Sequence, residues 1–288
     1  MTYNHERFIR AALEGFVSEQ TSFSFEIVIS DDCSSDGTRA IIAEYASKYP
    51  EIFRDVSPKE NLGVSRNFIH VLKEAKGKYI AFCEGDDYWT DPLKLQKQVD
   101  FMEAHPECTV TFHRYDILRQ EEQTWRKDAC DVYLRPDQSE VLLNVPMFFK
   151  RWVTQPCTMM YRYGTYLGQD KPYKEYKDQH IIFHLLTEGE GYILNFKGAV
   201  YREHQRGIHG RTPVIQQSRL AVEVAQELYD NNKEESSIKD NLVETLDWAI
   251  NCEKRYKEGD KRRLRVFIWR RLLMSKSIKI ALKQLLRK

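Results

Sequence analysis

The sequence lacks the patterns that mark several broad classes of protein. No stretch approaches the roughly 20 apolar residues that a spanning helix needs, which predicts no transmembrane segment. The first residues contain no apolar core of a secretory signal peptide. The cysteines form no Cys-x-x-Cys pair, so we expect free thiols in a reducing cytoplasm. They are scattered along the chain, at Cys33, Cys83, Cys108, Cys130, Cys157 and Cys252.

Acidic residues are absent from the end of the chain. Residues 261–288 contain eleven Lys or Arg and no Asp or Glu, whereas the first 260 residues contain 33 basic and 43 acidic side chains. The formal net charge of +1 therefore combines an acidic body with a basic tail. Hydrophobic and charged contents of 42% and 30% are those of an ordinary globular protein.

Helix and strand patterns alternate over the first part of the chain. Apolar residues at helical spacing predict helices over about 5–19, 38–48 and 65–76. Short apolar, β-branched runs predict strands over 25–29 and 79–83. This alternation predicts an α/β fold with a mainly parallel, helix-covered sheet. The stretch that follows is less regular up to about residue 215, after which the pattern is helical.

Acidic clusters follow both predicted strands. Asp31-Asp32 follows the first strand, and Glu84-Gly85-Asp86-Asp87 follows the second. In parallel sheets the ligand crevice lies outside the carboxyl ends of the strands. Three carboxylates within four residues repel one another unless a cation compensates them, and their oxygens suit Mg²⁺ or Mn²⁺. The alternative for this cluster is a solvated acidic turn.

The first cluster also has a structural interpretation. Asp31, Ser34 or Ser35 could cap the helix that follows, because small polar side chains accept hydrogen bonds from the first amides of a helix. We favour capping for Ser34, Ser35 and Asp36. For Asp32 we favour a carboxylate that accepts hydrogen bonds from a nucleotide.

A set of motifs in this order and spacing resembles the family 2 glycosyltransferases. The set contains Thr2-Tyr3-Asn4, Ser30–Thr38, Asn61-Leu62-Gly63 with Arg66-Asn67, Gly77–Ile80, and Glu84–Trp89 with Asp91-Pro92 and Lys94-Leu95. The resemblance is strong over residues 1–112, moderate over about 173–210 and absent over the last seventy or so. It implies a GT-A fold, which is a single α/β domain that binds a nucleotide-sugar. We therefore expect a GT-A-like domain over 1–214 and a helical C-terminal extension over 215–288.

The resemblance implies which residues bind the donor. Thr2 and Tyr3 belong to the nucleotide-binding motif, in which the Tyr3 ring matches the aromatic that packs on the base. Asp32 matches the carboxylate that reads the base. Arg66 lies where a basic residue can approach the diphosphate.

Two further donor-site predictions follow from later segments. Arg202 and His204 lie in a run that resembles the segment closing over the diphosphate, and their side chains suit an anionic leaving group. Glu84-Gly85-Asp86 falls on the Asp-x-Asp metal motif. Asp86 is the stronger ligand for Mg²⁺ or Mn²⁺, Asp87 is adjacent, and Glu84 departs from the pattern by one methylene.

The resemblance also implies a catalytic base. Lys177-Asp178-Gln179-His180 begins a helical run and resembles the acidic motif at the start of the acceptor-side helix, which implies that Asp178 is the base. A carboxylate at a helix N-terminus stays ionised because the helix dipole favours the anion, and it can then take the proton of an acceptor hydroxyl. From the residues alone, an N-cap role for Asp178 is the stronger interpretation. His180 and His184 lack the Glu of His-Glu-x-x-His and are interpreted as structural.

These residues predict an inverting glycosyltransferase. It would move a sugar from a nucleoside-diphosphate sugar to a hydroxyl of a glycan or lipid-linked acceptor, in the synthesis of a bacterial cell-surface polysaccharide. One alternative is an inactive relative that binds a sugar or a partner. Another is a metal-dependent nucleotidyltransferase, although the Gly-rich, basic phosphate loop of those enzymes is missing. No Gly-x-Gly-x-x-Gly follows a strand, which argues against NAD.

The basic tail allows two interpretations. Apolar residues interleave with the bases of 261–288, as in a helix that lies on an anionic membrane surface, which predicts a cytoplasmic protein held at the inner face of the membrane. The alternative is a helical appendage that packs on the acidic body. No nucleic-acid-binding motif accompanies the charge, so we expect no nucleic acid partner.

The first predicted helix begins almost at residue 5, with no strand before it. In the family, an apolar strand immediately precedes the Thr-Tyr-Asn motif and lies centrally in the sheet. We therefore expect the natural chain to start upstream of Met1.

Overall fold

The computed structural model describes residues 1–164, 173, 175, 177–207, 212–232, 238 and 245. The prediction for the tail at 261–288 lies outside these residues. Within them, no helix is long and apolar enough to cross a membrane.

The chain forms two compact units. The first consists of Met1–Leu143, Val153–Asp170 and Ile181–Glu203, and the second of Asn144–Trp152, Lys171–His180 and His204–Lys288. The predicted domain boundary between 214 and 215 stays a prediction.

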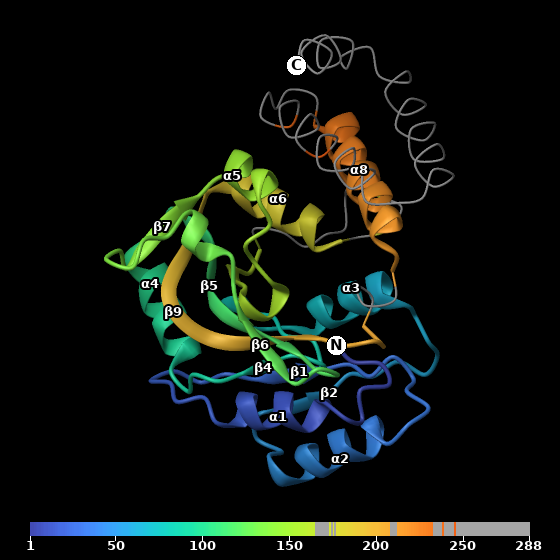
Figure 1. The fold of residues 1–288 in the computed structure, drawn as a ribbon. Coiled ribbons are helices and arrows are strands. Elements are labelled where there is room, and N and C mark those ends of the chain that lie inside the picture. The colour runs from blue at the N-terminus through green and yellow to red at the C-terminus, as the bar shows by residue number, and fades with distance from the viewer. Residues whose placement is uncertain are drawn as a thin grey trace, which may run out of the picture. The chain divides into compact units, whose positions relative to one another are not determined.

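The first part of the chain has the predicted alternation of helices and strands (Figure 1). Each predicted element is present with the same or slightly different bounds, and the structure adds β2, β4 and α4 to them. The elements are α1 (Ile9–Val17), β1 (Ile27–Ile29), α2 (Thr38–Lys48), β2 (Phe53–Asp55), α3 (Val64–Glu74), β3 (Tyr79–Ala81), β4 (Tyr88–Trp89) and α4 (Lys94–Ala104).

A small parallel sheet packs against α1 and α2. Strands β1 and β2 pair in parallel, with Ile27 opposite Phe53 and Ile29 opposite Asp55. Both helices lie on the same side of these strands (Figure 1). Burial of each large apolar side chain contributes about 1.5–3 kcal/mol, so this layer fixes the position of the polar loop after β1. The core of the layer is Ile9, Ala12, Leu13, Ile27, Ile29, Ile42, Tyr45 and Phe53.

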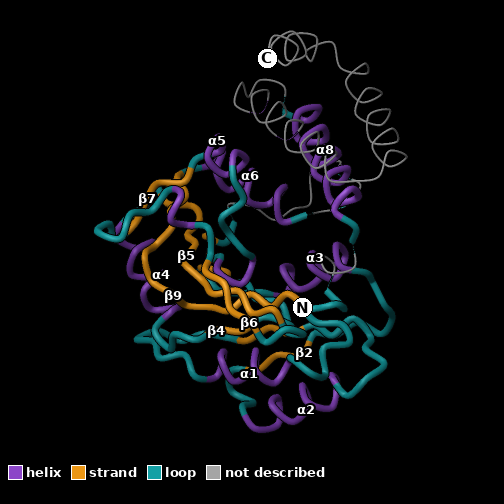
Figure 2. Tube along the Cα trace, viewed as in Figure 1, coloured by secondary structure: helices purple, strands orange, loops and turns teal. Residues whose placement is uncertain are grey.

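The larger sheet is mixed, so the prediction of a mainly parallel sheet is wrong. Its strand order is β3-β8-β5-β9-β4, with β6 paired to β5 and β7 paired to β9. Among these described strands, only β5 and β9 pair in parallel. Figure 2 shows β9 as a long, curved strand. The later strands are β5 (Cys108–Arg119), β6 (Thr124–Lys127), β7 (Glu140–Leu143), β8 (Met160–Arg162) and β9 (Glu190–Glu203).

Chain connectivity explains the change from parallel to antiparallel pairing. A parallel pair needs a long crossover, usually a helix, whereas antiparallel strands can follow a tight turn. The turn at Gln120–Gln123 joins β5 directly to β6, which makes that pair antiparallel. The sequence pattern beyond residue 112 is irregular, yet β5 and β9 pair at the centre of this sheet.

Met1 and Thr2 lie between the ends of β1 and β3. The Thr2 amide donates to the Ser30 carbonyl over 3.0 Å, and the Asp32 amide donates to the Thr2 carbonyl over 2.9 Å. On the other side, the Gly85 amide donates to the Met1 carbonyl over 2.9 Å. These bonds bring both acidic clusters to the same edge of the first unit.

Further helices that the structure describes are α5 (Val145–Lys150), α6 (Asp178–Glu188) and α8 (Val214–Asn231), and two 3₁₀ turns occupy Cys130–Val132 and Pro156–Thr158. Helix α8 confirms the helical pattern predicted after residue 215 over its own length. Its buried face includes Val222, Ala225, Leu228 and Tyr229.

Candidate active site

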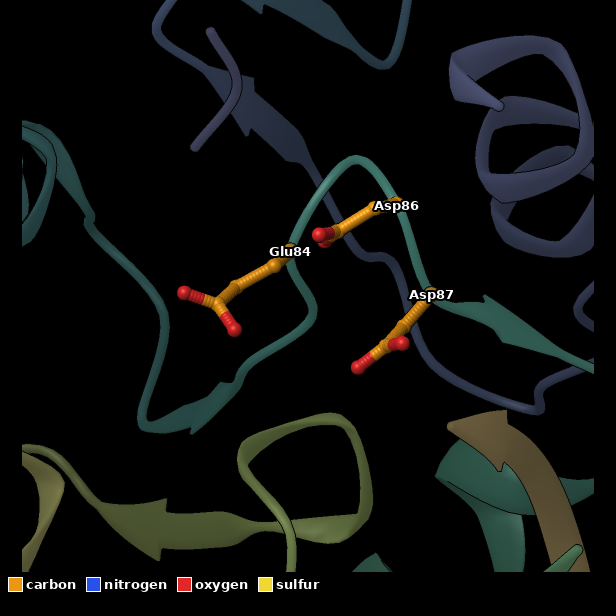
Figure 3. A group of neighbouring side chains, drawn as sticks. All are labelled: Glu84, Asp86 and Asp87. Atoms are coloured by element: carbon orange, nitrogen blue, oxygen red, sulfur yellow. The ribbon is translucent and has the colours of Figure 1, made fainter. Parts of the chain in front are cut away.

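Three carboxylates gather on the turn between β3 and β4. Glu84, Asp86 and Asp87 each offer one ligand oxygen, and these oxygens lie within 4.8 Å of one another. Figure 3 shows the three side chains projecting to one side of the turn. A Cβ at Gly85 would lie 2.5 Å from the Thr2 hydroxyl oxygen, so glycine allows the turn to approach Thr2 closely.

Asp87 is the buried member of this acidic triad, with 2% of its surface exposed. Its Oδ1 accepts a hydrogen bond from the Arg202 amide over 2.7 Å, while among the described residues its buried Oδ2 has no N–H or O–H donor and only the Cys157 thiol nearby. Burial, followed by the charges of Asp86 and Glu84, raises the pKa of Asp87 well above its usual range. An orphaned buried carboxylate oxygen of this kind needs a compensating group.

The triad fits a small divalent cation. An octahedral ion with ligands at 2.0–2.1 Å places opposite ligands about 4.2 Å apart, which is comparable with the spacing of the three oxygens. Carboxylate oxygens are the ligands that Mg²⁺ and Mn²⁺ prefer. The residues present are therefore compatible with either ion.

Arg202 supports the triad turn from strand β9. Its Nε donates to the main-chain carbonyl of Asp86 over 2.8 Å, and its Nη1 donates to the side-chain oxygen of Gln120. The guanidinium carbon lies 4.9 Å from the Phe8 ring centre and 5.1 Å from that of Tyr88. Two of its donor nitrogens are thus engaged within the protein.

His5 is a residue near the triad that sequence reasoning missed. Its Nε2 lies 3.6 Å from Oδ2 of Asp86. The only sequence signal was its position directly after Thr2-Tyr3-Asn4, because nothing local connects residue 5 with residue 86. An imidazole beside Asp86 adds a nitrogen that suits Mn²⁺ better than Mg²⁺.

Asp32 holds the loop that precedes α3. Its Oδ1 accepts the Leu62 amide over 2.7 Å, and its Oδ2 accepts the Gly63 amide over 2.9 Å. Arg66, in the first turn of α3, donates from Nε to the Leu62 carbonyl over 2.8 Å. The structure therefore brings Asp32 and Arg66 to one loop. Each carboxylate oxygen has a second lone pair that remains able to accept a further bond.

Polar residues in and just after the first acidic cluster form hydrogen bonds that hold this part of the chain. Asp36 accepts the amide of Thr38, the first residue of α2, over 3.0 Å, which agrees with a capping role. Ser34 instead accepts the Asn4 amide over 2.7 Å and donates its hydroxyl to Asp31. Asp31 is fully buried, whereas the Tyr3 ring beside this cluster is about half exposed, at 48%.

The two remaining predicted residues belong to the second unit. Asp178 is the first residue of α6, and its Oδ1 accepts the Gln179 amide over 3.1 Å. His204 follows the end of β9 and is buried. The first unit thus brings together Thr2, the triad and Arg202. Asp178 and His204 belong to the second unit.

The sequence model of one protein family, described as "Glycosyl transferase family 2", matches residues 1–176. The chain belongs to this family. The matched residues include the Thr2-Tyr3 motif, Asp32 and the acidic triad, and they end before Asp178. The family suggested by the resemblance is therefore confirmed.

Relatives of this family 2 glycosyltransferase match parts of it. An uncharacterized protein of Mycobacterium tuberculosis is 39% identical over 212 residues, which are 72% of this chain and 58% of that protein. The putative teichuronic acid biosynthesis glycosyltransferase TuaG of Bacillus subtilis is 37% identical over 122 residues, 42% of this chain and 46% of TuaG. The chain therefore spans about half the length of these relatives.

A third relative carries a more specific name. WfaP of Escherichia coli, a UDP-Glc:alpha-D-GlcNAc-diphosphoundecaprenol beta-1,3-glucosyltransferase, is 40% identical over 102 residues, which are 35% of this chain and 39% of WfaP.

Solved structures share the fold of this glycosyltransferase. Staphylococcus aureus TarS, in complex with UDP-GlcNAc, matches with a TM-score of 0.69 at 18% identity and covers 94% of this chain and 78% of the TarS chain. The mannosyltransferase PcManGT of Pyrobaculum calidifontis, in complex with GDP-Man and Mn²⁺, matches with a TM-score of 0.53 at 14% identity, covering 96% and 80% of the two chains. The GT-A-like α/β fold is confirmed, with a mixed sheet.

Proposed function

We propose that this protein transfers a hexosyl group from a UDP-sugar to a hydroxyl of a glycan or lipid-linked acceptor, in the synthesis of a bacterial cell-surface polysaccharide. The acidic triad at Glu84, Asp86 and Asp87 carries the proposal, because it lies on the same edge as the Asp32 loop. The names of TuaG and WfaP support this class of product, and WfaP and TarS support a UDP-sugar donor.

The donor would bind along the edge formed by Thr2-Tyr3 and the Asp32 loop. The half-exposed Tyr3 ring is available to pack on the base, and the free lone pairs of Asp32 can accept its N–H. Arg66 approaches the diphosphate from the first turn of α3. We assign Arg202, on β9, and His204, which directly follows β9 in the chain, to the diphosphate side as well.

A divalent cation, Mn²⁺ or Mg²⁺, would be held by Asp86 with Glu84 and Asp87, and when bound it would neutralise charge on the leaving diphosphate. Asp86 and Glu84 are partly exposed and can reach both ion and donor. The buried Asp87 fixes the turn through its bond to the Arg202 amide. The protein thus supplies oxygens in a preorganised arrangement.

Transfer would proceed by inverting displacement. The acceptor oxygen attacks the anomeric carbon as the bond from that carbon to the diphosphate oxygen breaks, and the bonding pair leaves with UDP. The carboxylate of Asp178 takes the acceptor proton. Its place at the first residue of α6 favours the ionised form that a base needs.

The test is UDP release from UDP-glucose and UDP-N-acetylglucosamine with Mn²⁺ present. We expect Asp86→Asn and Asp178→Asn to lower release at least 100-fold. The exposed Asp100→Asn serves as control, because Asp100 accepts only the Gln96 side chain among the described residues. Binding of UDP without any release in the wild-type protein would favour the inactive, sugar-binding alternative.

A lipid-linked acceptor implies work at a membrane surface. The basic tail at 261–288 would then hold the protein at the anionic inner face of the membrane from the cytoplasm. Flotation with anionic vesicles, with and without these residues, tests this; equal binding of both forms contradicts it.

A further inference from the structure

The first turn of α6 is closed by a histidine. The Lys177 amide donates to Nδ1 of His180 over 3.1 Å, and the His180 amide donates to the Lys177 carbonyl over 3.0 Å. The first bond is one half of a capping box, with His180 in the position that Glu or Gln usually occupies, while the main-chain carbonyl of Lys177 accepts the return bond. Asp178 lies inside the turn that these two bonds close.

The bond from Lys177 fixes the state of the His180 ring. A main-chain N–H can only donate, so Nδ1 must offer its lone pair and the ring proton must be on Nε2. That Nε2 lies 3.4 Å from Oε2 of Glu227, on helix α8. His180 is fully buried, so its ring has few alternative orientations.

A second contact joins α8 to the same histidine. The Tyr173 ring stacks on His180, with ring centres 4.1 Å apart and planes at 22°. The Tyr173 hydroxyl accepts from Nδ2 of Asn232, at the end of α8, over 3.4 Å. Helix α8 therefore contacts the ring of His180 directly through Glu227 and indirectly through Tyr173, all within the second unit.

We propose that His180 and Glu227 are positioning residues that hold Asp178 in the geometry needed for proton transfer. The inference rests on the proposed function, in which Asp178 is the base. Loss of the Glu227 contact removes an acceptor close to Nε2–H, which weakens the ring orientation that accepts the Lys177 amide and loosens the turn that carries Asp178. A displacement of about 1 Å at a reacting group can cost 100-fold in rate. Helix α8 is then part of the catalytic machinery, although it lies beyond the residues matched by the family.

Hydrogen exchange of the full chain tests whether Glu227 holds the turn that carries Asp178. We expect Glu227→Leu to increase exchange at least tenfold in peptides covering Lys177–His180, while α8 itself stays protected. Glu227→Gln keeps an acceptor for Nε2–H and should restore protection. Asp230→Leu is the matched control, because Asp230 is exposed on the same helix and accepts only from Gln226 among the described residues. Unchanged exchange in Glu227→Leu overturns the proposal.

Release of UDP from UDP-glucose, with water as acceptor, tests whether this positioning affects catalysis. We expect Glu227→Leu to lower kcat 10- to 100-fold with the KM for UDP-glucose unchanged, and Glu227→Gln to recover most of it. A general loss of folding would also lower the apparent kcat, but it would show as a lower midpoint of thermal unfolding, which is measured for each variant. If Asp178→Asn lowers kcat and Glu227→Leu does not, the positioning role is wrong. If Asp178→Asn has no effect, the proposed base is wrong, and the exchange result still decides whether α8 holds the turn.

Discussion

The Arg202 amide donates to the buried Oδ1 of Asp87 over 2.7 Å, and this bond ties the end of β9 to the turn that carries the acidic triad. The side chain of the same arginine holds the Asp86 carbonyl from Nε. One residue thus fixes two consecutive members of the triad, one through its main chain and the other through its side chain. Groups that orient metal ligands typically change metal affinity 10- to 100-fold when removed.

Replacing Arg202 should therefore weaken cation binding. We expect Arg202→Gln to raise the Kd for Mn²⁺ about tenfold, which equals about 1.4 kcal/mol, because the side-chain bond to Asp86 is lost while the main-chain bond to Asp87 remains. Electron paramagnetic resonance of free Mn²⁺ measures this directly. Arg126→Gln is the control, since Arg126 pairs with Glu203. Equal Mn²⁺ affinity in Arg202→Gln and wild type would contradict the role of the Arg202 side chain in holding the triad turn.

His5 offers a second test of the cation site. If the imidazole contributes a nitrogen to the ion beside Asp86, His5→Ala should weaken Mn²⁺ binding about tenfold and Mg²⁺ binding much less, because imidazole is a poorer ligand for Mg²⁺. Competition between the two ions in the Mn²⁺ titration gives both affinities. An equal loss for both ions would mean that His5 acts on Asp86 through charge alone.

The local features of this site could be predicted from the sequence. The strand before Asp31-Asp32 and the strand before Glu84 are short apolar runs that end in polar residues, and the pattern fixes both the strand and its edge. The triad itself is local in sequence. Hydrophobic periodicity and the chemistry of neighbouring carboxylates are enough to predict these strands and the triad.

The contacts that complete the site are between residues far apart in the sequence. Arg202 lies 115 positions from Asp87, and β9 pairs in parallel with β5 although both strands carry charged residues such as Arg114, Asp116 and Lys197. Mixed polar and apolar positions in those strands gave no clean alternation. A clear pattern exists only in the first part of the chain, where helices alternate with strands. That part alone predicts a mainly parallel sheet.

The Asp32 loop provides a stability test. Asp32→Asn replaces a charged acceptor of two amides by a group with one oxygen, and leaves one of the Leu62 and Gly63 amides facing an NH₂. We expect the free energy of unfolding to fall by about 1.5–3 kcal/mol, because hydrogen bonds to charged groups have that magnitude. Urea denaturation measures it. The exposed Asp55→Asn keeps an oxygen that can accept from the Ser57 amide, so it should change stability by less than half as much.

Two buried titratable side chains, Glu19 and Lys94, predict a pH dependence of stability. Burial raises the pKa of Glu19 to about 7, and burial lowers the pKa of Lys94 to about 8. Between pH 4.5 and 7 the unfolded chain has ionised Glu19 while the folded chain keeps it protonated. Because the folded chain then binds more protons, the free energy of unfolding falls as pH rises through this window.

Glu19→Gln should remove most of that slope. The variant keeps an oxygen for the Leu95 amide, which Glu19 accepts over 2.9 Å, but it has no proton to lose. We expect wild type to lose about 1–3 kcal/mol between pH 5 and 7.5 relative to Glu19→Gln, since each unit of pKa shift corresponds to about 1.4 kcal/mol. Urea denaturation at both pH values, with the exposed Glu60→Gln as control, gives the difference. The upper limit of pH 7.5 keeps the titration of Lys94 largely out of the measurement, so a parallel slope in wild type and Glu19→Gln would show that Glu19 is ionised in the folded protein throughout this range.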